Sequence, residues 1–109
     1  MSQTFTLKTL KEYSGQDESK PILLALNGKV YDVTTGRGFY GPGGSYSVFA
    51  GRDCTRGLAI GSLKPEDLPT EDDVFVTQET LDESLWQSML SWENRLKAKY
   101  PVVGTLVPN

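Results

Sequence analysis

The segment ILLALNGKVYDV, residues 22–33, is the clearest structural signal in the chain. Two short apolar runs flank Asn27 and Gly28, and Asn-Gly is the favoured pair for a two-residue turn because both positions need a positive φ. The segment therefore predicts a β-hairpin whose strands cover residues 22–26 and 29–33.

Helices are predicted on both sides of this hairpin. Before it, residues 6–13 predict a short helix with Thr6 as its cap and Gly15 as its stop. After it, apolar residues recur every three or four positions up to Pro101, as in a long amphipathic helix. The elements predicted there are short helices over 46–50 and 55–60, an acidic, proline-containing loop over 64–73, the long helix over 77–100 and a closing strand over 102–107. Together they predict an α+β fold in a single domain, residues 1–109.

Composition narrows the possible functions. The net charge is −3 and the 11 Lys and Arg residues are scattered, which argues against nucleic acid as a partner. Cys54 is the only cysteine, so no internal disulfide can form and a reducing, intracellular compartment is favoured. The longest apolar run, 22–26, is far too short to span a membrane, so the chain as given is expected to be soluble.

The chain contains no histidine, which limits its chemistry. A zinc site, a Ser-His-Asp triad and a Cys54 thiol activated by histidine are all disfavoured, and no enzymatic activity is predicted. What stands out instead is a set of tyrosines among glycines and apolar residues: Tyr31, Tyr40, Tyr46 and Tyr100. Each can be a half-buried core residue with one hydrogen bond or a ligand group, and the residues alone favour the core role for any one of them.

Three segments resemble one protein family. NGKVYDVT (27–34) is similar to the hairpin of cytochrome b5-like haem/steroid-binding domains. GRGFYGPGGSYSVFAGRDCTRGLA (36–59) resembles the core of the membrane-associated progesterone receptor family, which reads Phe-Tyr-Gly-Pro, then Tyr, then Phe-Ala-Gly-x-Asp-Ala-Ser-Arg-Gly-Leu-Ala. KYPVVGTL (99–106) is similar to the fungal damage-resistance branch of that family. The resemblance implies a cytochrome b5-like fold: a small mixed sheet, several short helices and one long C-terminal helix.

The resemblance also implies a ligand and the residues that hold it. The ligand is haem b, whose five-coordinate ferric iron is bound axially by the phenolate of Tyr46. Tyr100 would donate a hydrogen bond to that phenolate, and Tyr40 and Lys99 would reach the haem propionates. Apolar side chains are expected to form the pocket wall: Phe39, Val48, Phe49 and Leu58.

Other residues of these regions are interpreted as structural. Cys54 stands where the family commonly has alanine, and we expect a small buried thiol there. Trp86 and Trp92 are interpreted as packing residues rather than as residues that stack on a cofactor.

Three functions fit the resemblance. The first is a haem-binding regulator or haem donor for sterol-modifying haem monooxygenases, with the partner implied by the family alone. The second is a steroid- or sterol-binding module that uses the same cleft without obligate haem. The third, an electron carrier, is disfavoured because a phenolate ligand stabilises ferric iron. The family further implies the cytosolic face of the endoplasmic reticulum, and a homodimer formed by stacked haem faces.

Overall fold

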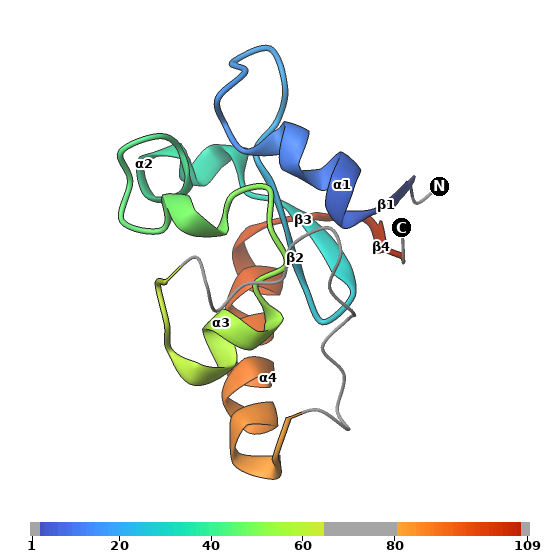
Figure 1. The fold of residues 1–109 in the computed structure, drawn as a ribbon, viewed down its shortest axis with the longest axis vertical. Helices are drawn as coiled ribbons and strands as arrows, with labels where there is room; N and C mark the ends of the chain where they lie inside the picture. The colour runs from blue at the N-terminus through green and yellow to red at the C-terminus, as the bar shows by residue number, and fades with distance from the viewer. Residues whose placement is uncertain (1–2, 65–80, 108–109) are drawn as a thin grey trace.

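The structure, a computed structural model, describes residues 3–64 and 81–107, and a mixed sheet of four strands forms the centre of this part of the chain (Figure 1). The strands are β1 (Gln3–Phe5), β2 (Leu23–Leu26), β3 (Lys29–Asp32) and β4 (Val102–Leu106). Their order is β1-β4-β3-β2, with β1 parallel to β4 and the other neighbours antiparallel. The predicted hairpin and closing strand are confirmed, whereas the sequence analysis did not predict β1.

The β2–β3 hairpin has the turn that Asn-Gly predicts. Asn27 has a φ of 55° and Gly28 a φ of 77°, so both residues adopt the left-handed conformation that such a turn needs. The two strands stop one residue short of the predicted outer ends. Pairing still continues there, because the Val33 amide donates a hydrogen bond to the Ile22 carbonyl at 2.8 Å.

Helices occupy the connections from β1 to β2 and from β3 to β4 (Figure 1). They are α1 (Leu7–Leu10), η1 (Lys11–Tyr13), η2 (Thr34–Gly36), α2 (Arg37–Tyr40), η3 (Ser47–Phe49), α3 (Thr55–Ile60) and α4 (Glu83–Lys99), where η marks a 3-10 helix. The predicted helix over 55–60 is confirmed, and the one over 46–50 is a shorter 3-10 turn. The helix over 6–13 is confirmed with Thr6 as its cap, although its second half tightens to η1. The sequence analysis did not predict α2.

The long helix α4 begins later than predicted. Asp82 has an extended backbone and its carboxylate accepts a hydrogen bond from the Leu85 amide at 2.8 Å, which makes it the N-cap. The prediction is therefore wrong for residues 81–82, while residues 77–80 and the 65–73 part of the predicted loop lie outside the described residues. The helix ends at Lys99, one residue before the predicted end. None of the helices described in 3–64 and 81–107 is long and apolar enough to cross a membrane.

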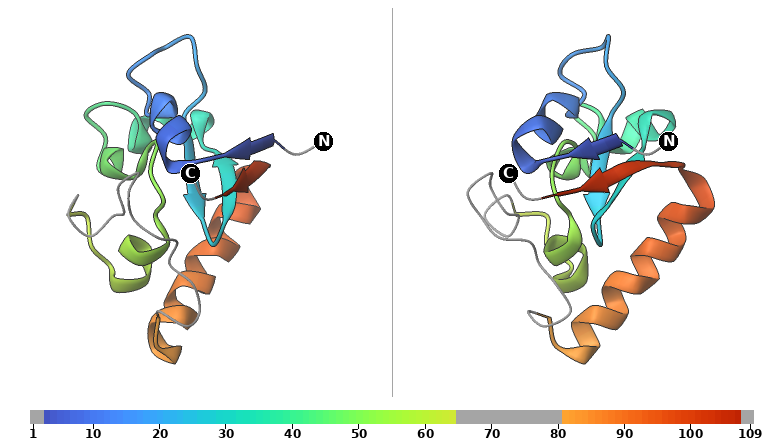
Figure 2. Two further views of the ribbon diagram at one scale, coloured as in Figure 1. Left: turned by 45° about the vertical axis from the view of Figure 1, so that its right-hand side comes forward. Right: turned by 90° about the vertical axis from the view of Figure 1, so that its right-hand side faces the viewer.

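The sheet separates two hydrophobic clusters. Successive side chains of a strand point to opposite faces, so Leu24 and Leu26 join one cluster while Leu23 and Ala25 join the other. The first cluster includes residues of α3 and α4, and the second includes the buried leucines of α1. Figure 2 accordingly shows α1 and α4 on opposite sides of the β2–β3 hairpin. The candidate site described below lies on the α4 side.

Residues 51–54 run along the outer edge of β2 and position α3. The Ala25 amide donates to the Arg52 carbonyl at 2.9 Å, and the Ala25 carbonyl accepts from the Cys54 amide at 2.7 Å. These bonds use backbone groups that an edge strand would otherwise expose. Because α3 begins directly after Cys54, the same bonds fix where it packs against α4.

Glu93 is a buried carboxylate of α4 that ties the helix to the hairpin turn. Only 5% of the residue is exposed. Its carboxylate accepts a hydrogen bond from the side-chain Nδ2 of Asn27 at 3.0 Å, and its oxygens lie 3.5 Å from Lys29 Nζ and 3.7 Å from Lys97 Nζ. A carboxylate taken out of water needs such partners, since an unmatched buried charge is strongly destabilising.

Replacing Glu93 by glutamine is expected to lower the free energy of unfolding by about 1 kcal/mol. Glutamine keeps an oxygen that can accept from Asn27 but loses the charge that faces two lysines. The control is Glu12→Gln, which removes an exposed ion pair with Lys20 (3.2 Å) and should change stability much less than Glu93→Gln does. Urea unfolding of both variants checks this, and equal losses would contradict a special role of the buried carboxylate.

Candidate functional site

Two pockets open between α4 and the segment that runs from α2 to α3. The first, of about 260 Å³ and here called the α2 pocket, is lined by Phe39, Tyr40, Tyr46, Trp92, Arg95, Leu96, Lys99 and Tyr100. The second, of about 210 Å³ and here called the α3 pocket, is lined by Tyr46, Phe49, Gly57, Leu58, Gly61, Ser62, Leu63 and Trp92. Tyr46 and Trp92 line both, so the two pockets are neighbouring parts of one cleft.

The rings of Tyr46 and Trp92 stand between these two parts. Their centroids are 6.4 Å apart and their planes are at 76°, an edge-to-face contact. Each pocket alone is smaller than the roughly 300 Å³ at which small-molecule sites usually begin, whereas the two volumes taken together fall within the usual range. A ligand that fills the whole cleft would therefore contact both Tyr46 and Trp92.

Tyr46 lies at the centre of an aromatic cluster. The Phe49 ring stacks on it at 6.0 Å and 17°, and the Tyr40 and Phe39 rings lie at 5.8 and 6.3 Å. Its side chain is half-buried, and within the described residues its hydroxyl makes no hydrogen bond. The ring is thus held by packing while its oxygen is left available to a ligand.

Backbone contacts place Tyr46 against the end of α2. Its amide donates to the Phe39 carbonyl at 2.8 Å, and its carbonyl accepts from the Phe49 amide at 3.0 Å. The preceding turn approaches α2 so closely that a Cβ on Gly44 would collide with the Phe39 carbonyl. Glycine at position 44 is therefore needed to fold the loop back and bring Tyr46 into the cleft.

Tyr100 and Tyr40 form a second pair of phenols in the α2 pocket. Their centroids are 6.1 Å apart and their planes nearly perpendicular, at 85°. The Tyr100 hydroxyl reaches so close to Gly36 that a Cβ there would overlap it. Burial, and to a smaller extent the neighbouring Tyr100, raises the pKa of Tyr40 above its usual range, so Tyr40 stays a neutral hydrogen-bond donor at physiological pH. No hydrogen bond joins Tyr100 to Tyr46 among the described residues, so the bond implied by the family stays a prediction for the ligand-bound cleft.

Two cations of the last turns of α4, Arg95 and Lys99, line the α2 pocket. The guanidinium carbon of Arg95 lies 4.9 Å from the Trp92 ring centroid, a cation–π contact that holds the side chain beside the pocket. Lys99 is exposed and lies one helical turn further on. The rim of the cleft is therefore basic, although the whole chain is acidic.

The structure gathers most of the residues singled out from the sequence. Tyr40, Tyr46, Lys99 and Tyr100 share the α2 pocket with Phe39, and Phe49 and Leu58 line the α3 pocket. Val48 packs against the main core but lines neither pocket.

Trp92 and Arg95 are the residues that the sequence analysis missed. Trp92 packs against the main core, as its interpretation as a packing residue expects, and its side chain also lines both pockets. Trp92, Arg95 and Lys99 recur at spacings of three and four residues, which places them on one face of a helix. That spacing, together with Tyr100 directly after it, is the signal from which both residues could have been found.

Cys54 is a buried thiol, as predicted. The residue is fully buried, its sulfur lies 3.4 Å from the Phe49 carbonyl oxygen, and burial raises the pKa of the thiol. A thiol without solvent access and with a raised pKa is a poor nucleophile. Cys54 therefore contributes to the core behind the cleft rather than to chemistry in it.

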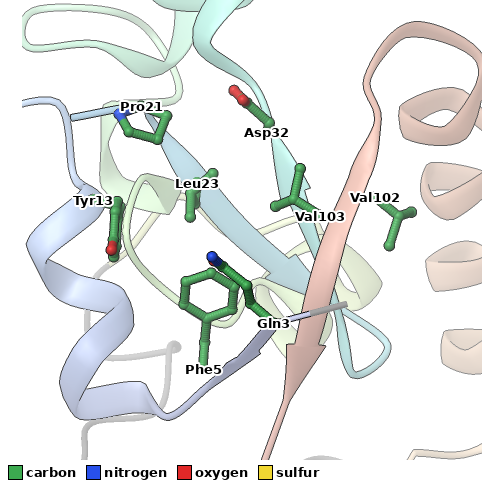
Figure 3. Close-up of a pocket in the computed structure, with 8 residues that line it drawn as sticks. All are labelled: Gln3, Phe5, Tyr13, Pro21, Leu23, Asp32, Val102 and Val103. Atoms are coloured by element: carbon green, nitrogen blue, oxygen red, sulfur yellow. The ribbon is translucent and has the colours of Figure 1, made fainter. Parts of the chain in front are cut away.

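A larger but shallower cavity, of about 750 Å³, lies on the α1 side of the sheet (Figure 3). Its floor is closed by packed side chains, since Phe5 is 5% and Leu23 2% exposed. Among the described residues that line it, Asp32 is the one acidic or basic side chain, and its carboxylate already accepts from the Thr34 amide at 3.0 Å. This cavity offers an anionic ligand no cation, so the cleft around Tyr46 is the better candidate site.

The mixed sheet, the short helices and the aromatic cleft against the long helix α4 define a small ligand-binding module. The sequence profile of the family described as "Cytochrome b5-like Heme/Steroid binding domain" matches residues 6–107. The chain belongs to this family.

Known relatives share both its sequence and its fold. An Arabidopsis thaliana protein named "Probable steroid-binding protein 3" is 48% identical, with 94% of this chain and 97% of that protein aligned. Human "Membrane-associated progesterone receptor component 2" is 45% identical, and the alignment covers 94% of this chain but 44% of the human protein. A solved Arabidopsis thaliana structure described as having a cytochrome b5 like fold superposes with a TM-score of 0.84, at 45% identity and over 97% of this chain and 92% of that one.

These relatives confirm the cytochrome b5-like fold and the likeness to the membrane-associated progesterone receptor family. The chain spans nearly all of the first Arabidopsis relative and less than half of the human one. The similarity of residues 99–106 to the fungal branch stays a prediction.

Proposed function

We propose that the cleft binds haem b and that the phenolate of Tyr46 is the axial ligand of its ferric iron. The observation that carries this proposal is the position of Tyr46, which lines both pockets with a hydroxyl that has no hydrogen-bond partner among the described residues. A phenolate is an anionic oxygen ligand that suits ferric iron, and catalase uses the same ligand type. The chain has no histidine that could take its place.

The remaining lining residues fit the other parts of a haem. Phe39, Phe49, Leu58, Leu96 and Trp92 offer apolar surface to a porphyrin. Lys99 and Tyr40 supply an ammonium and a phenol to the propionates at the rim. The joined volume of the two pockets is that of a small-molecule site, whereas neither pocket alone is large enough.

The chain's own groups would control the protons around the ligand. Tyr46 would give up its hydroxyl proton on binding, because a neighbouring ferric ion favours the charged phenolate. Tyr100 would then donate its hydroxyl proton into a hydrogen bond to that oxygen, which tunes the ligand. Bound haem would supply a ferric iron with an open coordination position.

In the cell, the proposed role is that of a regulator or haem donor rather than of an enzyme. By family resemblance, the recipients would be sterol-modifying haem monooxygenases at the cytosolic face of the endoplasmic reticulum. The same resemblance suggests a haem-dependent homodimer, and the exposed side chains of Phe39 and Leu63 at the cleft rim offer it apolar surface. Sedimentation of the protein with and without hemin tests the dimer, and an unchanged mass would contradict it.

Steroid binding is the second candidate, because close relatives are named steroid-binding proteins. A steroid would use the apolar walls of the same cleft and would need neither the phenolate nor the cations.

Titration of the protein with hemin tests the proposed function. We expect saturable binding with one hemin per chain at micromolar concentration, and strong quenching of Trp fluorescence because Trp92 lines the cleft. Progesterone and a sterol are titrated in parallel, alone and in competition with hemin. Absence of saturable hemin binding would contradict the proposal, and tight steroid binding in its place would establish the second candidate.

A further inference from the structure

Among the described residues, the α2 pocket is lined by two cations and by no acidic side chain. Arg95 and Lys99 are four residues apart on α4, so they project from the same helix face on successive turns. Lys97, which lies between them in the sequence, is instead paired with a carboxylate, because its Nζ lies 3.7 Å from the buried Glu93. The end of α4 thus has one cation matched by a carboxylate and two that face the pocket.

Neither cation of the pocket has an anionic partner within the described residues. The ion pairs found there join Lys20 to Glu12, and Lys29 and Lys97 to Glu93. Like charges four residues apart on a helix repel each other mildly. The C-terminal end of a helix favours cations and offsets part of this repulsion. An anionic ligand in the pocket would attract both cations and so outweigh the repulsion that remains between them.

Arg95 is also positioned by the wall of the cleft. Its guanidinium lies over the Trp92 ring at 4.9 Å, and Trp92 in turn contacts Tyr46 edge-on. A guanidinium stacked on an aromatic ring loses less side-chain freedom when it binds a carboxylate, and its planar fork can donate hydrogen bonds to both carboxylate oxygens at once. Arg95 is thus held ready at the same pocket as Lys99.

We propose that Arg95 and Lys99 form a two-cation clamp that selects a ligand with two carboxylates, a dicarboxylic tetrapyrrole, over a neutral sterol. The proposal rests on haem as the ligand of the cleft and adds Arg95, beside Lys99, as a second cation that binds a carboxylate. Both candidate ligands have the apolar surface that the cleft walls require. The clamp would favour haem over a sterol because only haem has negatively charged carboxylates.

The test separates the carboxylates from the iron by using protoporphyrin IX, which has no metal, and its dimethyl ester, which has no free carboxylate. Arg95→Gln and Lys99→Gln are each expected to weaken protoporphyrin IX binding about threefold to tenfold at low salt. Both variants should bind the dimethyl ester as the unchanged protein does. Lys97→Gln is the matched control, because it removes a cation of the same helix turn that faces Glu93, and it should leave both affinities unchanged.

A further variant separates charge from packing. Arg95→Lys keeps the charge but not the planar fork, and should restore part of the affinity for the free acid. Equal losses of free acid and ester affinity in Arg95→Gln would show that Arg95 only packs on Trp92 and would overturn the clamp. Unchanged free-acid affinity in that variant, or no protoporphyrin IX binding by the unchanged protein, would overturn it as well.

The two proposals can fail separately. If hemin binding does not depend on Tyr46 while protoporphyrin IX binding depends on Arg95, the iron ligand is wrong and the clamp stands. If hemin binding needs Tyr46 but the ester binds as tightly as the free acid in every variant, the clamp is wrong and the haem site stands.

Discussion

Tyr46→Phe is expected to lower hemin affinity by about a hundredfold or more, because it removes the axial ligand and leaves the cleft walls intact. Phenylalanine keeps the stacking on Phe49 and the edge contact with Trp92. The lost hydroxyl makes no hydrogen bond among the described residues, so the free energy of unfolding should change by less than about 0.5 kcal/mol. Hemin titration and urea unfolding of the same preparation separate the loss of binding from a loss of fold.

Tyr31→Phe is the matched control for this variant. The Tyr31 hydroxyl is buried and has no hydrogen-bond partner among the described residues, and burial raises its pKa to about 12. Removing an unsatisfied buried hydroxyl should leave stability equal or raise it slightly, and hemin affinity should not change because Tyr31 lines neither pocket. If Tyr46→Phe binds hemin as tightly as Tyr31→Phe does, Tyr46 is not the ligand.

Gly36→Ala is expected to lower hemin affinity about tenfold and the free energy of unfolding by about 1–3 kcal/mol. A Cβ at this position would overlap the Tyr100 hydroxyl and lie 3.2 Å from both Tyr100 Cζ and Tyr40 Cδ2. Both rings would have to move, and both line the α2 pocket. Thermal unfolding and hemin titration measure the two losses.

Gly38→Ala controls for the general effect of adding a methyl group near α2. A Cβ on Gly38 would meet no atom of the described residues within 4 Å, and the residue lies inside the helix. Alanine there should keep hemin affinity and raise stability by up to about 1 kcal/mol, because glycine is a poor helix former. Equal hemin affinity for the two variants would show that the position of Tyr100 does not matter for binding.

Elements with a strong local signal could be predicted from the sequence. The Asn27-Gly28 turn needs two positive φ angles, and the Thr6 cap and helix α3 likewise depend on neighbouring residues. The strand β1 was missed because its three residues are too few to show an alternating pattern and it pairs with β4 from the other end of the chain. The start of α4 was misplaced because Leu81 is apolar and fits the helical spacing, although it is buried before the Asp82 cap.

The candidate site could be predicted only in part, and that part came from the family resemblance and not from local sequence signals. Composition could not distinguish Tyr46 from the other tyrosines, so its assignment came from the family resemblance of residues 36–59. The contact of Trp92 with Tyr46 depends on how α4 packs against η3, which local sequence does not encode. The role of Arg95 depends on the same packing, because only the fold shows that the Trp92 face of α4 borders the pocket.

The resonance Raman spectrum of the ferric haem complex, prepared with and without ring-deuterated tyrosine, tests the central proposal most directly. A tyrosine bound to ferric iron gives phenolate vibrations that shift when its ring is labelled. We predict such vibrations in the unchanged protein and in Tyr31→Phe, and their loss in Tyr46→Phe. A spectrum without vibrations that shift on labelling, or one that is the same in Tyr46→Phe, would contradict Tyr46 as the ligand of the haem iron.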